Sequence, residues 1–156
     1  MGGSAGGIMI GRAITERPDL FSAAVCQVGG MNTLRSEISA NGPPNIPEFG
    51  TVTTEDGFRA LYEMDSYQHV VDGVSYPAVL LTHGFNDPRV DVWESAKMAA
   101  RLQKATASNK PILLRIDYEA GHGYGSTMSQ YTMQWADVCA FLLWQFGIPG
   151  FQPREQ

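Results

Sequence analysis

Cysteine, basic charge and long apolar runs are all scarce in this sequence of 156 residues, and each shortage argues against a class of protein. The two cysteines, Cys26 and Cys139, lie in apolar segments, so we expect buried thiols rather than a disulfide. Eleven basic residues against sixteen acidic ones argue against nucleic acid as the main partner. No apolar run is long enough to cross a membrane. The short apolar run at the start has no basic residue before it, whereas a signal peptide has a basic start. We therefore expect a cytoplasmic protein.

The rest of the composition is that of an ordinary globular protein. Hydrophobic residues make up 44% of the chain, which is enough for one domain with a core. Internal repeats, low-complexity tracts and blocks of like charge are absent from the sequence. We therefore expect a single domain over residues 1–156.

Short apolar runs alternate with helical patterns along the chain. The runs indicate strands at Ser22–Val28, Pro77–His83 and Ile112–Tyr118. They are almost continuously apolar, as in strands that are buried on both faces of a parallel sheet. Helical patterns cover Ile8–Ile14, a segment that starts near Asp91, and Met128–Leu142, where apolar residues recur at three- and four-residue steps. The alternation predicts an α/β fold with a mainly parallel sheet flanked by helices.

Two further patterns concern the helix ends and the longest connection. Asp91 and Glu94 have capping-box spacing. The segment Asn41–Pro47 is rich in turn residues, so we expect neither regular helix nor sheet there, and a short helix should follow over about Thr54–Met64. We expect this excursion to form an inserted cap or a pocket wall.

The first chemical signal is the G-x-S-x-G pattern from Gly2 to Gly6, with Ser4 at its centre. A nucleophilic serine needs a sharp turn that exposes its hydroxyl, and glycines two residues before and after would relieve the crowding there. A helix that follows would point its N-terminus at the site. A flexible start peptide or an anion-binding glycine loop fits the same pattern, so it is a weak signal alone.

An acid and a histidine follow the later strands, at the ends where α/β proteins carry reactive groups. Asp87 comes after the second strand, although Asp87-Pro88 also fits a plain turn and Asp91 is a competing carboxylate. His122 stands between two glycines after the third strand, which leaves it free to reach a serine. We interpret His69 and His83 as structural, because a lone histidine usually is.

The chain order Ser4, Asp87, His122 is that of an α/β-hydrolase triad and differs from the chymotrypsin and subtilisin orders. In this interpretation Ser4 attacks an acyl carbonyl, His122 takes and returns the proton, and Asp87 holds the imidazole tautomer. The backbone N–H of Ala5 would be one oxyanion donor. We expect no cofactor, and metal-dependent hydrolysis has little support because His83, Asp87 and His122 lack a recognised ligand spacing.

Together these motifs resemble the C-terminal half of the catalytic domain of the prolyl oligopeptidase family of serine hydrolases. The matching segments are Gly2–Gly7, Arg17–Phe21, Gln27–Gly29 with Met31, Asn86–Val90 with Trp93-Glu94, and Ala120–Gly123. The resemblance implies a truncated α/β-hydrolase fold that starts at the nucleophile elbow, with Ser4, Asp87 and His122 as the triad. The resemblance also implies that Arg89 contacts the substrate backbone. The alternative interpretation is that Arg89 forms an exposed salt bridge or anchors its loop.

Departures from the family shape the expected activity. Asn45 stands, by an ungapped count, where the family has a tryptophan that stacks on the substrate proline. We also find no acidic cluster of the kind that selects basic residues in oligopeptidase B. The family's β-propeller and the tyrosine that supplies its second oxyanion donor have no counterpart in the sequence. We therefore expect a carboxylesterase-like serine hydrolase that cleaves small acyl esters, with short peptides as less favoured substrates.

The family's strands before the elbow also have no counterpart, which predicts an assembly. Three strands that end at the elbow would leave an unpaired apolar edge, so we expect a homodimer or a higher homo-oligomer. The apolar segment Phe141–Phe146 is a second candidate contact, with ordinary core as its alternative. A different hypothesis is a noncatalytic oligomerisation or interaction fragment, in which the triad is a relic.

Overall fold

A parallel sheet of four strands, in the order β1-β2-β3-β4, forms the centre of the computed structural model, which describes residues 1–123 and 126–153. The strands are β1 (Gly2–Gly3), β2 (Ala23–Gln27), β3 (Ala78–Gly84) and β4 (Ile112–Asp117). All neighbouring pairs are parallel, with Val25 opposite Leu80 in the β2–β3 pair. The predicted α/β class and the three predicted strands are confirmed, and β1 is the two-residue strand that leads into Ser4.

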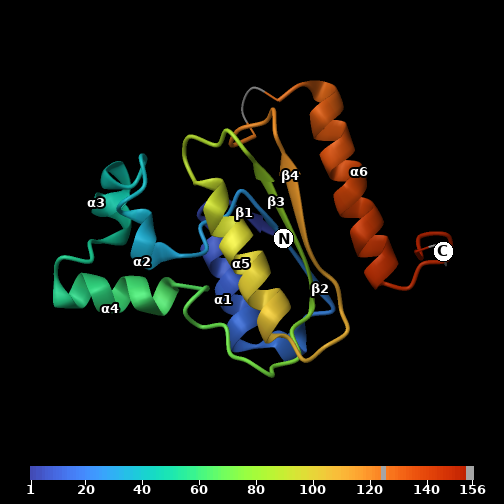
Figure 1. Ribbon diagram of the computed structural model, residues 1–156, viewed down its shortest axis with the longest axis horizontal. Coiled ribbons are helices and arrows are strands. Elements are labelled where there is room, and N and C mark those ends of the chain that lie inside the picture. Colours follow the sequence, from blue (N-terminus) through green and yellow to red (C-terminus); the bar gives the residue numbers. More distant parts are fainter. Residues whose placement is uncertain (124–125, 154–156) are drawn as a thin grey trace.

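Helices cover both faces of the sheet, as Figure 1 shows. On one face lie α1 (Gly6–Glu16) and α5 (Val92–Ala105), and on the other lies α6 (Met128–Gln145). The fully buried β3 serves both layers, because its side chains alternate between the faces. The first core includes Ile14, Val79, Leu81, Met98 and Leu102, and the second includes Val25, Leu80, Val138 and Phe141.

The connection from β2 to β3 forms a small helical group beside α1 (Figure 1). After the short 3-10 turn η1 (Pro18–Leu20) and β2 come α2 (Thr33–Ser36), η2 (Pro43–Asn45), α3 (Ile46–Phe49) and α4 (Glu55–Met64). The predicted helix from Thr54 is α4, with Thr54 as its N-cap. The segment 41–47 was expected to be irregular, yet it holds η2 and the start of α3. Their prolines lie at the first or second helical position, where a missing N–H costs little.

The predicted capping box at Asp91 and Glu94 is wrong. Asp91 occupies the N-cap position of α5, but its side chain makes no capping hydrogen bond and instead accepts one from the Trp93 indole. Glu94 is buried and accepts hydrogen bonds from the backbone N–H groups of Met31 and Asn32. A long-range contact has therefore replaced the local one. A capping box does form at the start of α6, where Thr127 is the N-cap.

The two cysteines differ in their surroundings. Cys26 is buried, as predicted, and burial raises the pKa of its thiol to about 12, so it is a neutral core side chain. Cys139 is exposed on α6, which contradicts the prediction. The apolar pattern over Met128–Leu142 predicted a more buried helix than α6 is. Val138 and Phe141 are buried, but Met128 and Tyr131 are exposed like Cys139. Within the described ranges, none of the helices combines the length and apolar character that a membrane span requires.

Candidate functional site

Ser4 lies at the tight turn between β1 and α1. Its φ of 53° is in the left-handed region, which non-glycine residues rarely adopt. Backbone hydrogen bonds hold the turn, from Ser4 N–H to the Gln27 carbonyl at 3.0 Å and from Gly30 N–H to the Ser4 carbonyl at 3.2 Å. The backbone around Ser4 is thus held in a strained shape of the kind that a nucleophile elbow needs.

The two glycines predicted to relieve steric crowding at the Ser4 turn differ in whether a side chain would fit. A Cβ on Gly2 would lie 2.6 Å from the Gly6 carbonyl oxygen, so Gly2 is required. A Cβ on Gly6 would meet nothing within 4 Å, so the prediction for Gly6 is wrong. The second crowded position is Gly7, where a Cβ would lie 2.5 Å from the Cα of Gly29. This glycine lets α1 approach the loop after β2.

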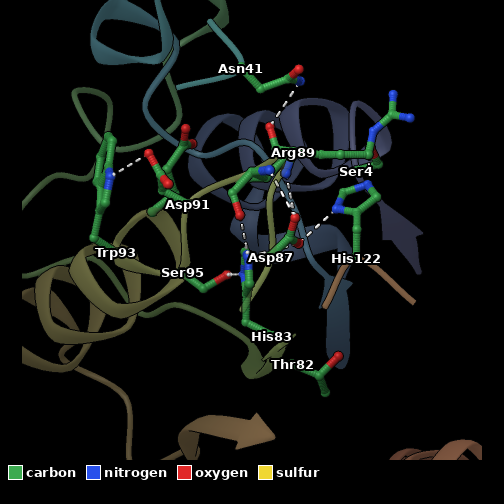
Figure 2. Close-up of polar contacts among 12 residues, drawn as sticks. Ser4, Asn41, Thr82, His83, Asp87, Arg89, Asp91, Trp93, Ser95 and His122 are labelled. Carbon is green, nitrogen blue, oxygen red and sulfur yellow. Dashed lines mark hydrogen bonds and ion pairs between the residues drawn. The ribbon is translucent and has the colours of Figure 1, made fainter. Parts of the chain in front are cut away.

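Ser4, His122 and Asp87 form one chain of hydrogen bonds, shown in Figure 2. The distance from His122 Nε2 to Ser4 Oγ is 2.9 Å, and that from His122 Nδ1 to Asp87 Oδ2 is 2.7 Å. A carboxylate only accepts, so Nδ1 carries the hydrogen and Nε2 accepts from the serine hydroxyl. The three residues follow β1, β3 and β4, whose carboxyl ends lie at the same edge of the sheet.

Asp87 is a buried carboxylate surrounded by donors. Its Oδ1 accepts from the backbone N–H groups of Arg89 at 2.8 Å and Val90 at 3.0 Å. Burial is the largest single influence and raises the pKa of Asp87, but the hydrogen bonds from His83, Val90, Arg89 and His122 together outweigh it and lower the pKa to about 2. Asp87 is therefore ionised at neutral pH and can stabilise an imidazolium at His122.

Ala5 occupies the N-cap position of α1, next to Ser4. Within residues 1–123 and 126–153, its backbone N–H has no hydrogen-bond acceptor, and the first turn of α1 holds no acidic side chain. The positive end of the helix dipole therefore faces the serine, and the first turn of α1 itself contributes no opposing charge. This is an arrangement that can stabilise negative charge developing on an acyl oxygen.

Two cavities meet at Ser4, and Ser4 and Arg89 line both. The first, of about 350 Å³, lies beside His122 and extends to Tyr131 and Trp135 on α6. The second, of about 120 Å³, is lined by residues that include Ala5, Gly30, Asn41, Asn45, Phe49 and Glu94. The excursion between β2 and β3 therefore forms a pocket wall, as predicted.

Arg89 is exposed, and its backbone rather than its guanidinium anchors the loop. Its N–H donates to Asp87, and its carbonyl accepts from Asn41 Nδ2 at 3.3 Å. In the described part of the chain, no carboxylate lies within ion-pair distance of its guanidinium. The cation is thus available to a bound molecule in either cavity, and the salt-bridge alternative is not supported.

The sequence interpretation missed the place of His83. This histidine lies beside Asp87, with its Nε2 at 3.3 Å from Asp87 Oδ2. Its position near the end of a buried strand, four residues before the acid, does not by itself distinguish a core residue from a site residue. His69, by contrast, lies against Tyr62 and bonds the Asp65 carbonyl, consistent with a structural role.

Within residues 1–123 and 126–153, no group of three or more histidine, cysteine, aspartate or glutamate side chains is arranged to hold a metal ion.

The model of the prolyl oligopeptidase family matches residues 1–149. The chain belongs to the prolyl oligopeptidase family. It is 34% identical to a prolyl endopeptidase of Elizabethkingia miricola over 148 residues, which are 94% of this chain and 21% of that protein. A prolyl endopeptidase of Dictyostelium discoideum is 33% identical over 90% of this chain and 19% of its own length. The chain therefore spans about a fifth of these curated relatives.

Solved structures agree with this family assignment. A prolyl endopeptidase structure matches with a TM-score of 0.90 and 34% identity over 94% of this chain and 22% of its own. Oligopeptidase B from Leishmania major matches with a TM-score of 0.80 and 29% identity over 92% of this chain and 21% of its own. The fold is thus that of an α/β-hydrolase catalytic domain, and the family is one of serine hydrolases. The relatives are named as peptidases, so the expected preference for esters finds no support among them.

Proposed function

We propose that this chain carries the acyl-transfer site of a serine peptidase. The supporting observation is the continuous hydrogen-bond chain Ser4–His122–Asp87, with distances of 2.9 and 2.7 Å. Ser4 Oγ bonds to the carbonyl carbon of the substrate while its proton passes to His122 Nε2. The imidazolium then gives this proton to the leaving amine, and an acyl-enzyme remains. Water attacks the acyl-enzyme by the same route and restores Ser4.

The Ala5 N–H, next to Ser4 at the N-cap of α1, would support the oxyanion of each tetrahedral intermediate. Arg89 would donate to a carbonyl oxygen of the bound substrate, which is supported by its place in the lining of both cavities. No carboxylate in the described residues competes for that guanidinium.

Short peptides are the proposed substrates, and acyl esters of the same sequence should also react. The 120 Å³ cavity beside Ala5 is small, so it suits a single side chain on the acyl side of the cleaved bond. Asn45 in its wall is polar and bonds the Asn41 carbonyl at 2.9 Å, so this position offers no aromatic ring on which a proline could stack. Esters have the better leaving group, so they demand less of the same site.

A matched pair of substrates tests the proposal. The p-nitroanilide and the p-nitrophenyl ester of one blocked dipeptide are compared on wild type, Ser4→Ala and His122→Ala. We expect turnover of both substrates, faster for the ester, and a fall of at least about 10³-fold in each variant. Ester turnover without anilide turnover would instead support the carboxylesterase prediction. Turnover that is the same in Ser4→Ala would contradict any role of this serine.

We further propose a homo-oligomer, with a noncatalytic interaction fragment as the alternative function. The supporting observation is β1, which has two residues and pairs only with β2 within the described sheet. Light scattering should give a mass that is a multiple of the 17.0 kDa chain. A stable monomer would contradict the oligomer, and robust turnover lost in His122→Ala would rule out the noncatalytic alternative. The cytoplasmic location stays a prediction.

A further inference from the structure

Asp87 lies between two imidazole rings, not one, as Figure 2 shows. Its Oδ2 is 2.7 Å from His122 Nδ1 and 3.3 Å from His83 Nε2. The side chains of His83 and Asp87 have no solvent exposure at all. The second imidazole is therefore a permanent buried neighbour of the carboxylate that contacts His122.

The surroundings of His83 fix its tautomer. Its Nε2 lies 2.9 Å from the Val90 carbonyl, which can only accept, so Nε2 carries the hydrogen. Asp87 Oδ2 lies near the same nitrogen, at 3.3 Å. The Nδ1 atom lies 2.7 Å from Ser95 Oγ and accepts its hydrogen. Both ring nitrogens are thus occupied, so the ring can hold the carboxylate but has no free position for the reaction's proton.

His83 also joins three elements at one point. The residue belongs to β3, Ser95 belongs to α5, and Asp87 and Val90 belong to the loop that connects them. Val90 takes part twice, because its carbonyl accepts from His83 and its N–H donates to Asp87 Oδ1. Without the ring, Oδ2 would lose its buried imidazole neighbour, and the loop would lose the hydrogen bond between Val90 and β3. The Asp87 side chain could then rotate away from His122.

We infer that His83 is a positioning residue, which holds Asp87 Oδ2 where that oxygen orients His122 toward Ser4. This inference rests on the proposed function, because it assigns His83 a part in the same acyl transfer. The His83 side chain has no solvent exposure, and its ring nitrogens bond Ser95 and Val90 rather than Ser4, so we assign its effect on the reaction to its contact with Asp87.

Three variants separate positioning from simple core packing. His83→Phe keeps a ring but removes the donor, whereas His83→Gln keeps an N–H that can reach Asp87. His69→Phe is the matched control, since His69 lies against Tyr62 with one bond to the Asp65 carbonyl. For the anilide substrate, we expect kcat to fall on the order of 100-fold in His83→Phe with little change in KM. His83→Gln should recover part of this loss, and His69→Phe should match wild type.

A second measurement needs no turnover. Proton NMR should show the His122 Nδ1–H at low field, because this proton is hydrogen-bonded to a carboxylate. We expect the resonance to shift or disappear in His83→Phe and to persist in His83→Gln and His69→Phe. An unchanged resonance, or a kcat of folded His83→Phe equal to that of His69→Phe, would overturn the inference. If wild type shows the resonance but no turnover, the proposed peptidase function is wrong. The NMR comparison of the variants would still test whether His83 positions Asp87. If His83→Phe does not fold, His83→Gln is compared with Asp87→Asn. A His122 resonance that is equally disturbed in these two variants would overturn the inference.

Discussion

Two regions of the molecule contact Ser4, and they are built differently. The carboxyl edge of the sheet carries Asp87 and His122 on loops that are fixed by buried hydrogen bonds. The excursion between β2 and β3 consists of short helices, and its tip at Pro43–Pro44 is exposed. The first region holds reacting groups in place, whereas the second shapes the 120 Å³ cavity. Substitutions at the edge should therefore alter the reaction rate, and substitutions in the excursion should alter substrate selectivity.

The excursion is anchored at its base rather than at its tip. Asp65 is buried and accepts from Asn32 Nδ2, Leu34 N–H and Gln68 N–H. Lys97 on α5 donates to Asn32 and lies over the Tyr67 ring. Near the tip, Asn41 donates one hydrogen bond to the Arg89 carbonyl at the edge. Substitutions near the tip should therefore leave the fold intact.

The largest effect is expected at the edge, from Asp87→Asn. The amide oxygen would take the two backbone N–H donors at Oδ1, so its NH₂ would face His122 Nδ1. His122 would then have to carry its hydrogen on Nε2 and could no longer accept the proton of Ser4. We expect kcat to fall on the order of 10⁴-fold. Stability at neutral pH should also fall, because the lowered pKa of Asp87 means that its carboxylate stabilises the fold. Steady-state kinetics on the anilide substrate measures the change in kcat, and a fall of less than about tenfold would contradict the triad.

An effect of intermediate size is expected when two adjacent glycines are replaced by alanine, because only one of the two variants should lose stability. Gly7→Ala would place a Cβ 2.5 Å from the backbone of Gly29, which should destabilise the fold by about 1–3 kcal/mol. Gly6→Ala enters open space on α1 and should be neutral, or stabilising by up to about 1 kcal/mol. Chemical denaturation of both variants measures the difference. Equal stabilities would show that the close approach of α1 to the loop after β2 is not as tight as described.

The smallest effect is expected in the excursion, from Asn45→Trp. An indole in the wall of the cavity beside Ala5 would offer a stacking surface to a proline on the acyl side. We expect the preference for proline over alanine at that position to rise by up to about tenfold in kcat/KM. Asn45→Ala is the control, because it also removes the bond to the Asn41 carbonyl but adds no ring. Identical preferences in both variants would mean that this wall does not contact the substrate.

The same two regions differ in how far the sequence alone predicts them. The buried strands and the order of Ser4, Asp87 and His122 were predictable, because apolar runs and loop motifs are local signals. The crowding at Gly7 was not, because it depends on Gly29 from a different element. Glu94 has the spacing of a cap, but its actual partners, Met31 and Asn32, are distant in sequence. The missed part of the site is therefore the part that rests on long-range contacts.

His83 illustrates the same limit within the site itself. A lone histidine at a strand end carries no local signal that distinguishes packing from positioning. Only the distances to Asp87, Val90 and Ser95 reveal that its ring faces the acid. The helices η2 and α3 were missed for another reason, since prolines at the first or second helical position look like helix breakers in a sequence.

The most direct test of the central claim is the mass of the protein after reaction with a fluorophosphonate, which labels an activated serine. We expect one adduct per chain in wild type, located on Ser4 by peptide mapping, and none in Ser4→Ala. His122→Ala should label far more slowly, because its serine has no base. Equal labelling of wild type and Ser4→Ala, or an unlabelled wild type, would contradict the claim that Ser4 is an activated nucleophile.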